Sequence, residues 1–568
     1  MVQIAILIGF CITLYMLNLG LWDLWNPDEP RYAQVAREMV TGGNWVLMHA
    51  NGERYVDKPP LFFWLIAFSS FLWQGLTSFS ARFPSALLGM LTVLLTFVLG
   101  RRLYSGRTGF LSALVLATSI EFAYLSTRAN IDATLTFFTT ASLLIFLHWY
   151  QHDKMKRSGE KDKRSLSIYG FYAGMALATL TKGPVGFILP LLVSLVYLFL
   201  EKDWVALKRM RLLTGMILCF GMILSWYVLA ALKGGQSFID ETLLHHTLDR
   251  FAKGSSHARP FYYYFVNFPA DFMPWVLFLP GAIVFGLSKR EEGISKGFLF
   301  LLVWFVSIFL FFTFSKGKRE LYLLPLYPAA ALIVGRYWEE YLSGESLASF
   351  QKIWITVPIY ALMILLLGMG VVLLAVPAVA NVPIGFASPG MLKMVVKAAG
   401  VGANYLSYIP PSRVIPFIVL LLGSGFLLAV AQSFRNRCLV FSLIVAAVGI
   451  GFFYGTRFIF PLVNPYKSAR FLSQEITQTI KSGEKLAMYG DFGSVGTAPY
   501  NLYTGIVPIL EIEEEAPLID FLRSNERVFC LFKNREFEML RRKYPGAPFH
   551  LLTKRRVGDR EMALVSNR

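Results

Sequence analysis

The stretch LWDLWNPDEPRYAQVAREMVTGGNWVLMHANGERYVDKPPLFFWLIAF, residues 21–68, decides how the chain is interpreted. It begins at the end of one apolar segment and ends inside another. Between them lies a dense set of charged side chains, with Asp28 and Glu29 near its start and Asp57 and Lys58 near its end. Charged side chains are costly inside a bilayer, so we expect this set in a loop at the membrane surface.

Apolar segments recur along most of the 568-residue chain, in which 55% of residues are hydrophobic and 16% are charged. The mean hydropathy is +0.53. Each segment has roughly 18 residues or more, enough to cross a bilayer as a helix. The runs are continuous rather than alternating, which excludes a transmembrane β-barrel. The sequence therefore predicts a polytopic α-helical membrane protein. Fourteen candidate segments lie near 2–22, 59–76, 83–100, 108–127, 133–150, 167–182, 183–200, 212–232, 270–288, 297–314, 321–338, 353–378, 414–433 and 438–456.

The net charge of +18 has two explanations, contact with nucleic acid or basic loops that face anionic membrane lipid. In a chain this apolar the second is favoured, and we expect no nucleic-acid partner. Residues 2–22 have no basic region before them and no small-residue cleavage site, so a retained first helix is expected. The cysteines form neither a disulfide framework nor a zinc-finger spacing. They are Cys11, Cys219, Cys438 and Cys530.

The basic loops predict which way the chain crosses the membrane. The most basic connection, HDKMKRSGEKDKR at 152–164, is expected in the cytoplasm, where positive loops gather. Counting spans backwards from it places Asp132 outside. The segment 59–76 begins with two prolines and is short and aromatic, so we expect a juxtamembrane helix rather than a span. Thirteen spans remain, with the N-terminus inside. The other basic connections expected on this side lie at 101–107, 201–211 and 288–296.

Two domains are expected. Residues 1–456 would form the transmembrane domain, with the outer loops 23–82 and 233–269 forming the site. Residues 457–568 are polar and mixed, and short apolar stretches such as KLAMYG alternate with charged ones. This tail is long enough for a small α/β domain on the outer side.

Several basic residues lie in the short loops expected outside, although Lys and Arg usually gather in cytoplasmic loops. Their position therefore requires an explanation. They are Arg31, Lys58, Lys182, Arg250, Lys316, Lys318 and Arg319. Anionic groups of a ligand, phosphates above all, are a physical reason for such cations. For Lys58 the alternative is snorkelling at the interface.

The outer acids have two interpretations each. Asp28 and Glu29 can belong to a helix start, where acids meet the positive end of the dipole. They can also do chemistry, since a carboxylate takes a proton from a hydroxyl or stabilises positive charge on a sugar ring. Asp132 poses the same choice between an N-cap and a site acid.

A metal site is a further hypothesis. The outer loop 240–265 contains three histidines, and His245 or His246 paired with Asp57 would hold a cation. No HExxH or comparable spacing supports this, and a polar loop with a helix is the alternative. The sequence requires no cofactor, and a divalent cation stays open.

Several motifs together resemble the GT-C membrane glycosyltransferases. They are DEPRYA (28–33), DKPPL (57–61), an Asp before a later span, TKGP (181–184) and KRELYLLPLYPA (318–329). The sequence is similar above all to the bacterial 4-amino-4-deoxy-L-arabinose lipid A transferases, which are related to protein O-mannosyltransferases. The motifs run in order over most of 1–460. DEPRYA with DKPP is a specific combination, whereas TKGP alone is weak.

The resemblance implies a GT-C fold with thirteen spans, periplasmic juxtamembrane helices and a C-terminal periplasmic domain. It also implies sugar transfer on the periplasmic side of a bacterial inner membrane, from an undecaprenyl-phosphate-linked donor. Asp28 matches the acid at the catalytic centre, with Glu29 and Arg31 beside it. Asp132 matches an acid of the second outer loop, which orients the first.

The resemblance also implies a set of donor contacts. Lys58 matches a lysine near the lipid phosphate, and Arg250 matches a phosphate-binding arginine. Tyr55 and Tyr322 stand where tyrosines of the family line the site. Lys318 belongs to the cations that precede Tyr322.

The predicted activity is an inverting transfer of a sugar, with 4-amino-4-deoxy-L-arabinose favoured, to lipid A or another periplasmic-side acceptor. Lys58 and Arg250 would stabilise the leaving phosphate, at roughly 3 kcal/mol each. A sugar donor on a polyprenyl phosphate needs no nucleotide, which fits the absence of a P-loop or Rossmann pattern. No pair of carboxylates with a retaining spacing is readable, which favours inversion. The sequence leaves the oligomeric state open.

Two alternatives stay open. One is a transferase of a hexose, mannose or galacturonic acid to lipopolysaccharide core, protein or another glycan. The other is a flippase or transporter of lipid-linked sugar, which predicts polar residues deep in several spans and an inverted repeat. The spans are strongly apolar, with Glu121 one exception, and this disfavours transport.

Overall fold

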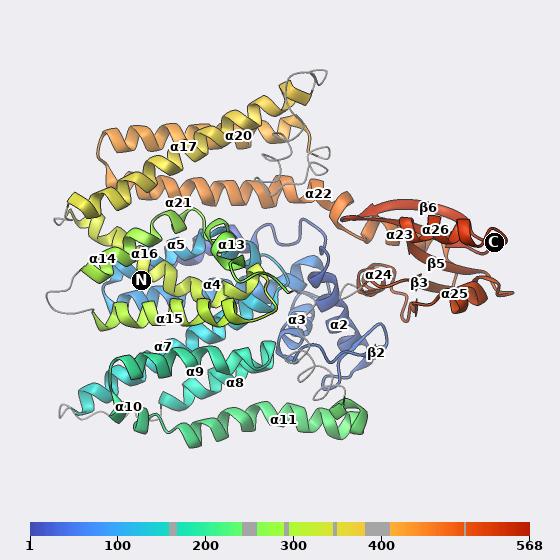
Figure 1. The fold of residues 1–568 in the computed structure, drawn as a ribbon, viewed down its shortest axis with the longest axis horizontal. Coiled ribbons are helices and arrows are strands. Elements are labelled where there is room, and N and C mark those ends of the chain that lie inside the picture. The colour runs from blue at the N-terminus through green and yellow to red at the C-terminus, as the bar shows by residue number, and fades with distance from the viewer. Residues whose placement is uncertain (158–166, 241–257, 289–294, 345–348, 381–408, 493–495) are drawn as a thin grey trace.

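The computed structural model describes the chain except for residues 158–166, 241–257, 289–294, 345–348, 381–408 and 493–495. Long helices run roughly side by side along the longest axis of the molecule, and a sheet domain lies at one end (Figure 1). The chain is a multi-pass membrane protein by this architecture, since apolar helices of this length satisfy their backbone groups inside a bilayer.

The predicted apolar segments are mostly helical where the structure describes them. In the first half they are α1 (Val2–Cys11) with the π-helical turn η1 (Ile12–Met16), α4 (Ser78–Leu103), α5 (Gly106–Ala117), α6 (Ile120–Ser126), α7 (Ile131–Arg157), α8 (Ile168–Lys182), α9 (Val185–Leu200) and α11 (Leu212–Ile239), with the short α10 (Trp204–Arg209) between the last two. In the second half they are α13 (Tyr263–Asp271), η4 (Trp275–Leu277), α14 (Leu279–Ser288), α15 (Lys296–Phe314), η6 (Glu320–Leu326), α16 (Tyr327–Ser343), α17 (Ser349–Ala380), α20 (Pro411–Ser433), α21 (Arg437–Tyr454), η7 (Gly455–Ile459) and α22 (Phe460–Lys467).

Helix length supports fewer spans than the sequence count does. Among the described helices, 7 are long and apolar enough to cross a membrane, or 9 if each of two bent pairs counts as one span. The bends are 71° between α5 and α6 and 116° between α13 and the helix that follows it. The expected thirteen spans are therefore not confirmed.

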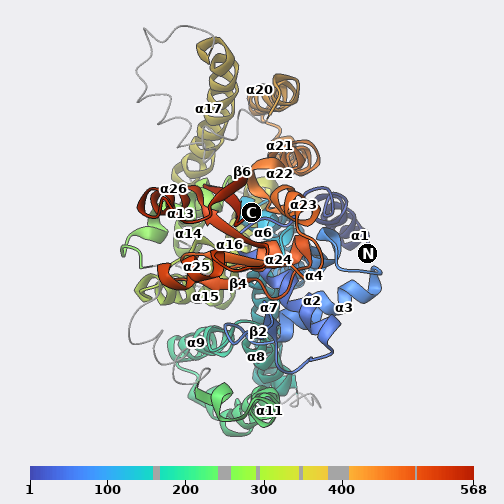
Figure 2. The ribbon, with the colours of Figure 1, turned by 90° about the vertical axis from the view of Figure 1, so that its right-hand side faces the viewer.

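The segment 59–76 contains the helix α3 (Leu61–Leu72), which has only 12 residues. At 1.5 Å per residue this is about 18 Å, short of the ~30 Å hydrocarbon core. α3 and the charged helix α2 (Asp28–Gly42) lie together at the end of the bundle, beside the sheet domain (Figures 1 and 2). The length of α3 agrees with the prediction that segment 59–76 forms a juxtamembrane helix.

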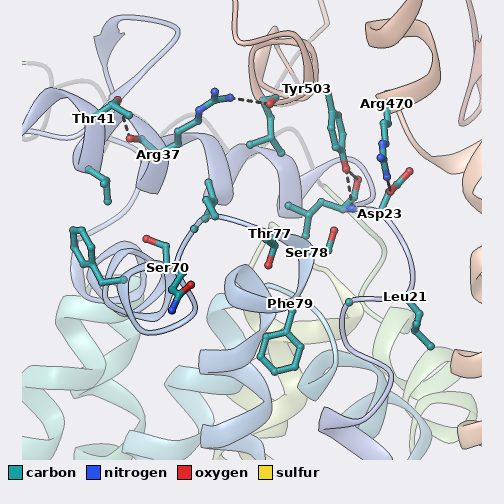
Figure 3. Close-up of a pocket in the computed structure, with 18 of the residues that line it drawn as sticks. Leu21, Asp23, Arg37, Thr41, Ser70, Thr77, Ser78, Phe79, Arg470 and Tyr503 are labelled. Atoms are coloured by element: carbon teal, nitrogen blue, oxygen red, sulfur yellow. Dashed lines mark hydrogen bonds and ion pairs between the residues drawn. The ribbon is translucent and has the colours of Figure 1, made fainter.

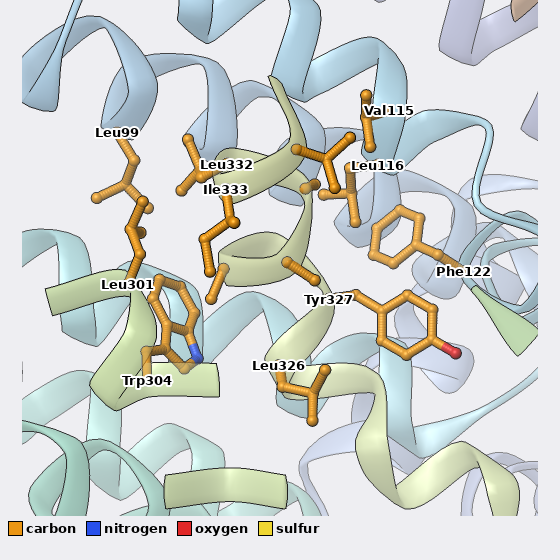
Figure 4. Close-up of a cluster of buried hydrophobic side chains, with 14 of the residues drawn as sticks. Leu99, Val115, Leu116, Phe122, Leu301, Trp304, Leu326, Tyr327, Leu332 and Ile333 are labelled. Carbon is orange, nitrogen blue, oxygen red and sulfur yellow. The ribbon is translucent and has the colours of Figure 1, made fainter. Parts of the chain in front are cut away.

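The core of the bundle forms where α4, α5, α15 and α16 meet. Leu99, Leu116, Trp304 and Ile333 interdigitate there and are almost fully buried (Figure 4). Small residues bring the backbones close, and a Cβ on Gly100 of α4 would lie 2.6 Å from the α-carbon of a glycine on α5. Close approach at small residues is how helices gain packing contacts in a membrane.

Connections that were expected on the cytoplasmic side meet at one end of the bundle. Lys154 of α7 binds Glu201 at 3.2 Å, and Lys296 at the start of α15 binds the same carboxylate at 3.4 Å. Arg209 pairs with Asp153 at 3.3 Å. Asp132 lies at the other end, because α7 begins at Ile131 and ends at Arg157.

The C-terminal part is a small α/β domain, as predicted. Its five-stranded sheet has the order β4-β3-β5-β7-β6, with β3 parallel to β4 and β5, and β7 antiparallel to β5 and β6. The strands are β3 (Lys485–Tyr489), β4 (Leu510–Ile512), β5 (Val528–Lys533), β6 (His550–Val557) and β7 (Arg560–Ser566). The helices are α23 (Arg470–Thr479), α24 (Ala498–Thr504), α25 (Glu515–Leu522) and α26 (Asn534–Lys543). The last membrane helix continues past residue 457 and ends at Lys467, so the elements of this domain begin with α23.

Asn51 joins the first loop to this domain through three hydrogen bonds. Asn51 lies between β1 (His49–Ala50) and β2 (Glu53–Arg54), is buried, and has a left-handed φ of 60°. Its side chain donates to the carbonyl of Ile509 at 2.9 Å and accepts from the amide of Ile509 at 2.7 Å. It also accepts from Asn501 at 2.9 Å. The loop that carries the predicted site therefore rests against the C-terminal domain.

Candidate active site

Asp28 begins α2, directly after Pro27 at the N-cap position. Its carboxylate does not cap the helix but forms ion pairs with Arg31 at 2.9 Å and with Arg319 at 2.7 Å. Burial by itself would raise the pKa of Asp28, yet Arg319, Arg31 and Arg128 hold this pKa below its usual value. Asp28 is therefore an ionised carboxylate, held by two arginines at the end of the bundle where α2 lies.

Glu29 lies one residue further and is only 1% exposed. Arg82 donates to it twice, at 2.7 and 3.0 Å, and Arg128 forms an ion pair with it at 2.8 Å. The backbone amides of Trp25 and Ala129 each donate to it at 2.9 Å. These contacts use the acceptor capacity of a carboxylate. The geometry favours a positioning role for Glu29, which ties the first outer loop to α4 and to the loop before α7, over the catalytic role expected from sequence.

Asp132 lies in the first turn of α7 and is 3% exposed. Its carboxylate forms an ion pair with Lys182, the last residue of α8. The Lys182 ammonium also lies 4.1 Å from the ring centroid of Tyr322. Helix capping is not the role of Asp132, because the side chain of Asn130 accepts from the Asp132 amide at 2.7 Å. Asp132, Lys182 and Tyr322 thus form one cluster.

Arg31 connects the two motifs of the first outer loop. Besides Asp28 it reaches Asp57, with 3.9 Å between the guanidinium and the carboxylate. Lys58 follows and is half-buried, directly before the prolines that precede α3. Tyr55 is buried, with its ring edge-on to Phe63 at a centroid distance of 5.6 Å. Arg31 therefore links Asp28 of DEPRYA to Asp57 of DKPP.

The two acid clusters are neighbours across Arg319. The pKa of Arg319 is raised: burial opposes its charge, while Asp28, Tyr322 and Asp132 favour it. Burial raises the pKa of the Tyr32 hydroxyl, and the charges of Asp28 and Asp132 both raise it further. Asp28 and Asp132 therefore lie in one region at the same end of the bundle.

Lys318 is placed differently from the expectation. It is 4% exposed and donates to the backbone carbonyl of Arg259 at 3.4 Å and to that of Ser315. Arg319, not Lys318, reaches Asp28. The backbone at Arg319 is extended, with φ −138° and ψ 149°, so consecutive side chains point to opposite sides.

The metal hypothesis involves residues that are only partly described. His245 and Arg250 lie outside the described residues. Asp57 is described and pairs with Arg31. In the part of the chain that the structure describes, no group of three or more His, Cys, Asp or Glu side chains is arranged to hold a metal. Asp57 and His245 as metal ligands, like Arg250 as a phosphate ligand, stay predictions.

Four basic residues of the site were not among the residues predicted to act in it: Arg82, Arg128, Lys182 and Arg319. Lys182 and Arg319 carried a signal as cations in outer loops. Arg82 is fully buried near the start of an apolar helix, where an unpaired guanidinium would be costly, so it required an acid partner. Nothing in the sequence indicates that this partner is Glu29, 53 residues earlier.

A cavity of about 310 Å³ opens beside Asp28. Its wall carries charges of both signs, with carboxylates from α2, α6 and η6 and cations from three separate segments. The charged residues that line it are Asp28, Glu29, Glu121, Arg128, Arg319, Glu320 and Lys467. A polar cavity with several charged groups is suited to an ionised ligand.

A larger cavity, of about 990 Å³, lies between α2, α3, the start of α4 and the C-terminal domain. Leu21 and Phe79 form part of its apolar wall, while Arg470 pairs with Asp23 at 3.1 Å on the opposite side (Figure 3). Arg37 also lines it and donates to a backbone carbonyl of α24 at 2.9 Å. None of the residues predicted to act in catalysis lines this cavity in the described part of the chain.

Comparison with known proteins agrees with this architecture. A model of the dolichyl-phosphate-mannose-protein mannosyltransferase family matches residues 1–235. The undecaprenyl phosphate-alpha-4-amino-4-deoxy-L-arabinose arabinosyl transferase 2 of Pseudomonas fluorescens (strain Pf0-1) is 32% identical over 58% of this chain and 59% of its own length. The corresponding transferase of Enterobacter sp. (strain 638) is 31% identical over 59% of each chain. The chain thus spans about three fifths of the length of these curated relatives.

Solved structures extend the likeness to the whole chain. ArnT from Cupriavidus metallidurans, in a crystal structure bound to undecaprenyl phosphate, matches with a TM-score of 0.75 and 20% identity, over 99% of this chain and 98% of that one. The apo oligosaccharyltransferase of Archaeoglobus fulgidus matches with a TM-score of 0.51 and 10% identity, over 95% and 70% of the two chains. The chain is thus similar in sequence to these membrane glycosyltransferases and shares its overall fold with ArnT.

Proposed function

We propose that the chain is an inverting glycosyltransferase that takes a sugar from undecaprenyl phosphate and passes it to a phosphate of lipid A. The sugar favoured is 4-amino-4-deoxy-L-arabinose, which the matching curated proteins carry in their names. The site would face the periplasm from the inner membrane. The observation that carries the proposal is Asp28, held ionised between Arg31 and Arg319 in a fold shared with a protein bound to undecaprenyl phosphate.

In the proposed reaction, an oxygen of the acceptor phosphate attacks the anomeric carbon of the sugar. The bond between that carbon and the oxygen of undecaprenyl phosphate breaks, and the carrier leaves as a phosphate monoester. Negative charge develops on this leaving group. Lys58, at the end of the first outer loop, is the described cation assigned to it.

Asp28 is better suited to charge stabilisation than to proton transfer. A general base works best with a pKa near the working pH, whereas two arginines lower the pKa of Asp28. A phosphate acceptor needs no base, since its second pKa is ~6. The Asp28 carboxylate would instead face the positive charge that develops at the anomeric centre. This supports a phosphate acceptor over a hydroxyl acceptor.

The test is transfer by purified protein in detergent, with undecaprenyl phosphate aminoarabinose and lipid A. We expect Asp28→Asn and Lys58→Ala to lose transfer by roughly 100-fold or more while remaining folded. Lys316→Ala is the matched control, because Lys316 is an exposed cation of an outer loop outside the cavity. Near-normal transfer by both site variants would overturn the site assignment.

A neutral hexose is the second candidate donor sugar, because the mannosyltransferase family model matches residues 1–235. The same assay distinguishes the two. A donor that carries mannose in place of aminoarabinose should be a poor substrate if the first proposal holds.

A further inference from the structure

Arg319 belongs to a short segment, residues 315–319, that connects α15 to η6. Its guanidinium reaches Asp28 at the end of a long side chain, which is 27% exposed. A long side chain loses much rotamer freedom when it is held in one geometry. The position of the Arg319 backbone therefore decides how well the guanidinium pairs with Asp28, and contacts from a second element fix that backbone.

The chain that leads into α13 lies against this segment. Ala258 forms an antiparallel bridge with Gly317. The ammonium of Lys318 donates to the backbone carbonyl of Arg259 at 3.4 Å. The two residues directly before Arg319 are therefore held by the two residues 258 and 259, which are distant from them in the sequence.

Tyr264, the second residue of α13, holds the backbone of Arg319 itself. Its hydroxyl donates to the Arg319 carbonyl at 3.1 Å, and the residue is fully buried. Its ring packs against Phe309 of α15, with 6.5 Å between the ring centroids. The hydroxyl of the neighbouring Tyr263 donates to the carboxylate of Glu320. Two consecutive tyrosines of α13 thus hold two consecutive residues, Arg319 and Glu320.

The extended backbone at Arg319 turns this support into a direction for the guanidinium. Consecutive side chains of an extended segment point to opposite sides, so Lys318 turns away and Arg319 turns to Asp28. Asp28 faces three cations, which are Arg319, Arg31 on its own helix and Arg128 on the loop before α7. A shift of the segment that carries Arg319 would weaken one of these three contacts and leave the other two in place.

We propose that Tyr264 is a positioning residue for the transfer reaction, because its hydroxyl fixes the backbone of Arg319 and thereby holds the Arg319 guanidinium on the Asp28 carboxylate. The proposal rests on the proposed function, in which Asp28 must be ionised and fixed. It gives α13 a role in the reaction that acts through Arg319 rather than through contact with the substrate.

The first test is a double-mutant cycle on transfer by the purified full-length protein. Tyr264→Phe should lower transfer at neutral pH roughly 3- to 10-fold, as expected for the loss of one neutral hydrogen bond. In an Arg319→Gln background the same change should have almost no further effect, because two residues that act through one contact are not additive. Tyr262→Phe, at an exposed tyrosine of the same run, is the matched control and should transfer like the wild type.

A pH profile separates positioning from a general loss of folded protein. The acid limb of the rate profile of Tyr264→Phe should move in the same direction as that of Arg319→Gln, by a smaller amount. A limb that moves in Arg319→Gln but stays in place in Tyr264→Phe would overturn the proposal. So would unchanged transfer by Tyr264→Phe, or a full further loss of transfer in the double variant.

Hydrogen exchange gives a readout that does not require transfer. Peptides that cover residues 315–322 should exchange faster in Tyr264→Phe than in the wild type, whereas peptides of the distant strand β5 should exchange equally in both. Equal exchange over 315–322 would overturn the proposal whether or not the protein transfers a sugar. Absence of transfer by the wild-type protein, together with the faster exchange in the variant, would overturn the proposed function alone.

Discussion

The guanidinium of Arg319 donates to the carboxylate of Asp28 at 2.7 Å, although 291 residues separate the two in the chain. Arg319 comes from the loop between α15 and η6, and Asp28 begins the first helix of the first outer loop. Together with Arg31 it makes Asp28 a doubly paired carboxylate. This pairing sets what Asp28 can do, because it stabilises the ionised form and lowers basicity.

Removing Arg319 should weaken transfer and move its pH dependence. Arg319→Gln removes one of the cations that lower the pKa of Asp28, so this pKa should rise. If ionised Asp28 is required, the acid limb of the pH–rate profile shifts to higher pH in the variant. We expect transfer at neutral pH to fall roughly 10- to 100-fold, since a charge-assisted hydrogen bond contributes about 1.5–3 kcal/mol.

The control for this experiment is Lys316→Gln in the same loop, whose pH profile should match the wild type. If the acid limb of Arg319→Gln stays in place, the titrating group is the acceptor phosphate. Ionisation of Asp28 would then not limit the rate of transfer in this pH range.

Glu29 should be a stability residue. Glu29→Ala leaves Arg82, which is 0% exposed, without its acid partner. Breaking a buried ion pair on one side costs about 3–5 kcal/mol of folding free energy. A large loss of melting temperature in detergent is therefore expected, whereas Glu53→Ala, at an exposed position of β2, should change it little.

Low pH should weaken the ion pairs of Glu29 with Arg82 and Arg128, because it protonates the Glu29 carboxylate. Burial alone would raise the pKa of Glu29, but Arg128 and Arg82 hold it below its usual value. A carboxyl with a lowered folded-state pKa stabilises above its unfolded pKa, about 4.3, and this stability is lost as the pH falls through the folded pKa. The melting temperature of the wild type should therefore stay constant from pH 7 to about pH 5 and fall below about pH 4. Below about pH 4 a Glu29→Gln variant should lose less of its melting temperature than the wild type, and an equal loss would contradict the assignment.

Asn51 should link the first outer loop to the C-terminal domain. Asn51→Gly keeps a left-handed backbone accessible but removes the hydrogen bonds to Ile509 and Asn501. The variant should lose about 1–3 kcal/mol of stability, and limited proteolysis should cut faster at the junction of the two domains. Unchanged proteolysis would mean that other contacts, such as that of Arg37 with α24, hold the domain in place.

Much of the fold could be predicted because it depends on local composition. The apolar runs became helices, and the short segment after the two prolines became a 12-residue helix. The mixed tail became an α/β domain. The span count could not be settled in this way, because the helices bend by 71° between α5 and α6 and by 116° after α13, and an apolar run does not by itself predict such bends.

The site was predicted only in part, for a similar reason. The spacing of DEPRYA and DKPP indicated a shared loop, and Arg31 does join Asp28 to Asp57. The choice between Lys318 and Arg319 depended on which side chain of an extended segment turns towards Asp28, which sequence alone does not give. The partners of Glu29, and the presence of Lys467 in the cavity, arise from contacts between distant elements.

The most direct measurement is mass spectrometry of lipid A from cells that express the wild-type chain or its Asp28→Asn variant at equal levels. The proposed function predicts a mass increase of one pentosamine per modified phosphate with the wild type and unmodified lipid A with the variant. Lipid A that is the same in both strains, or that gains a hexose instead, would contradict it.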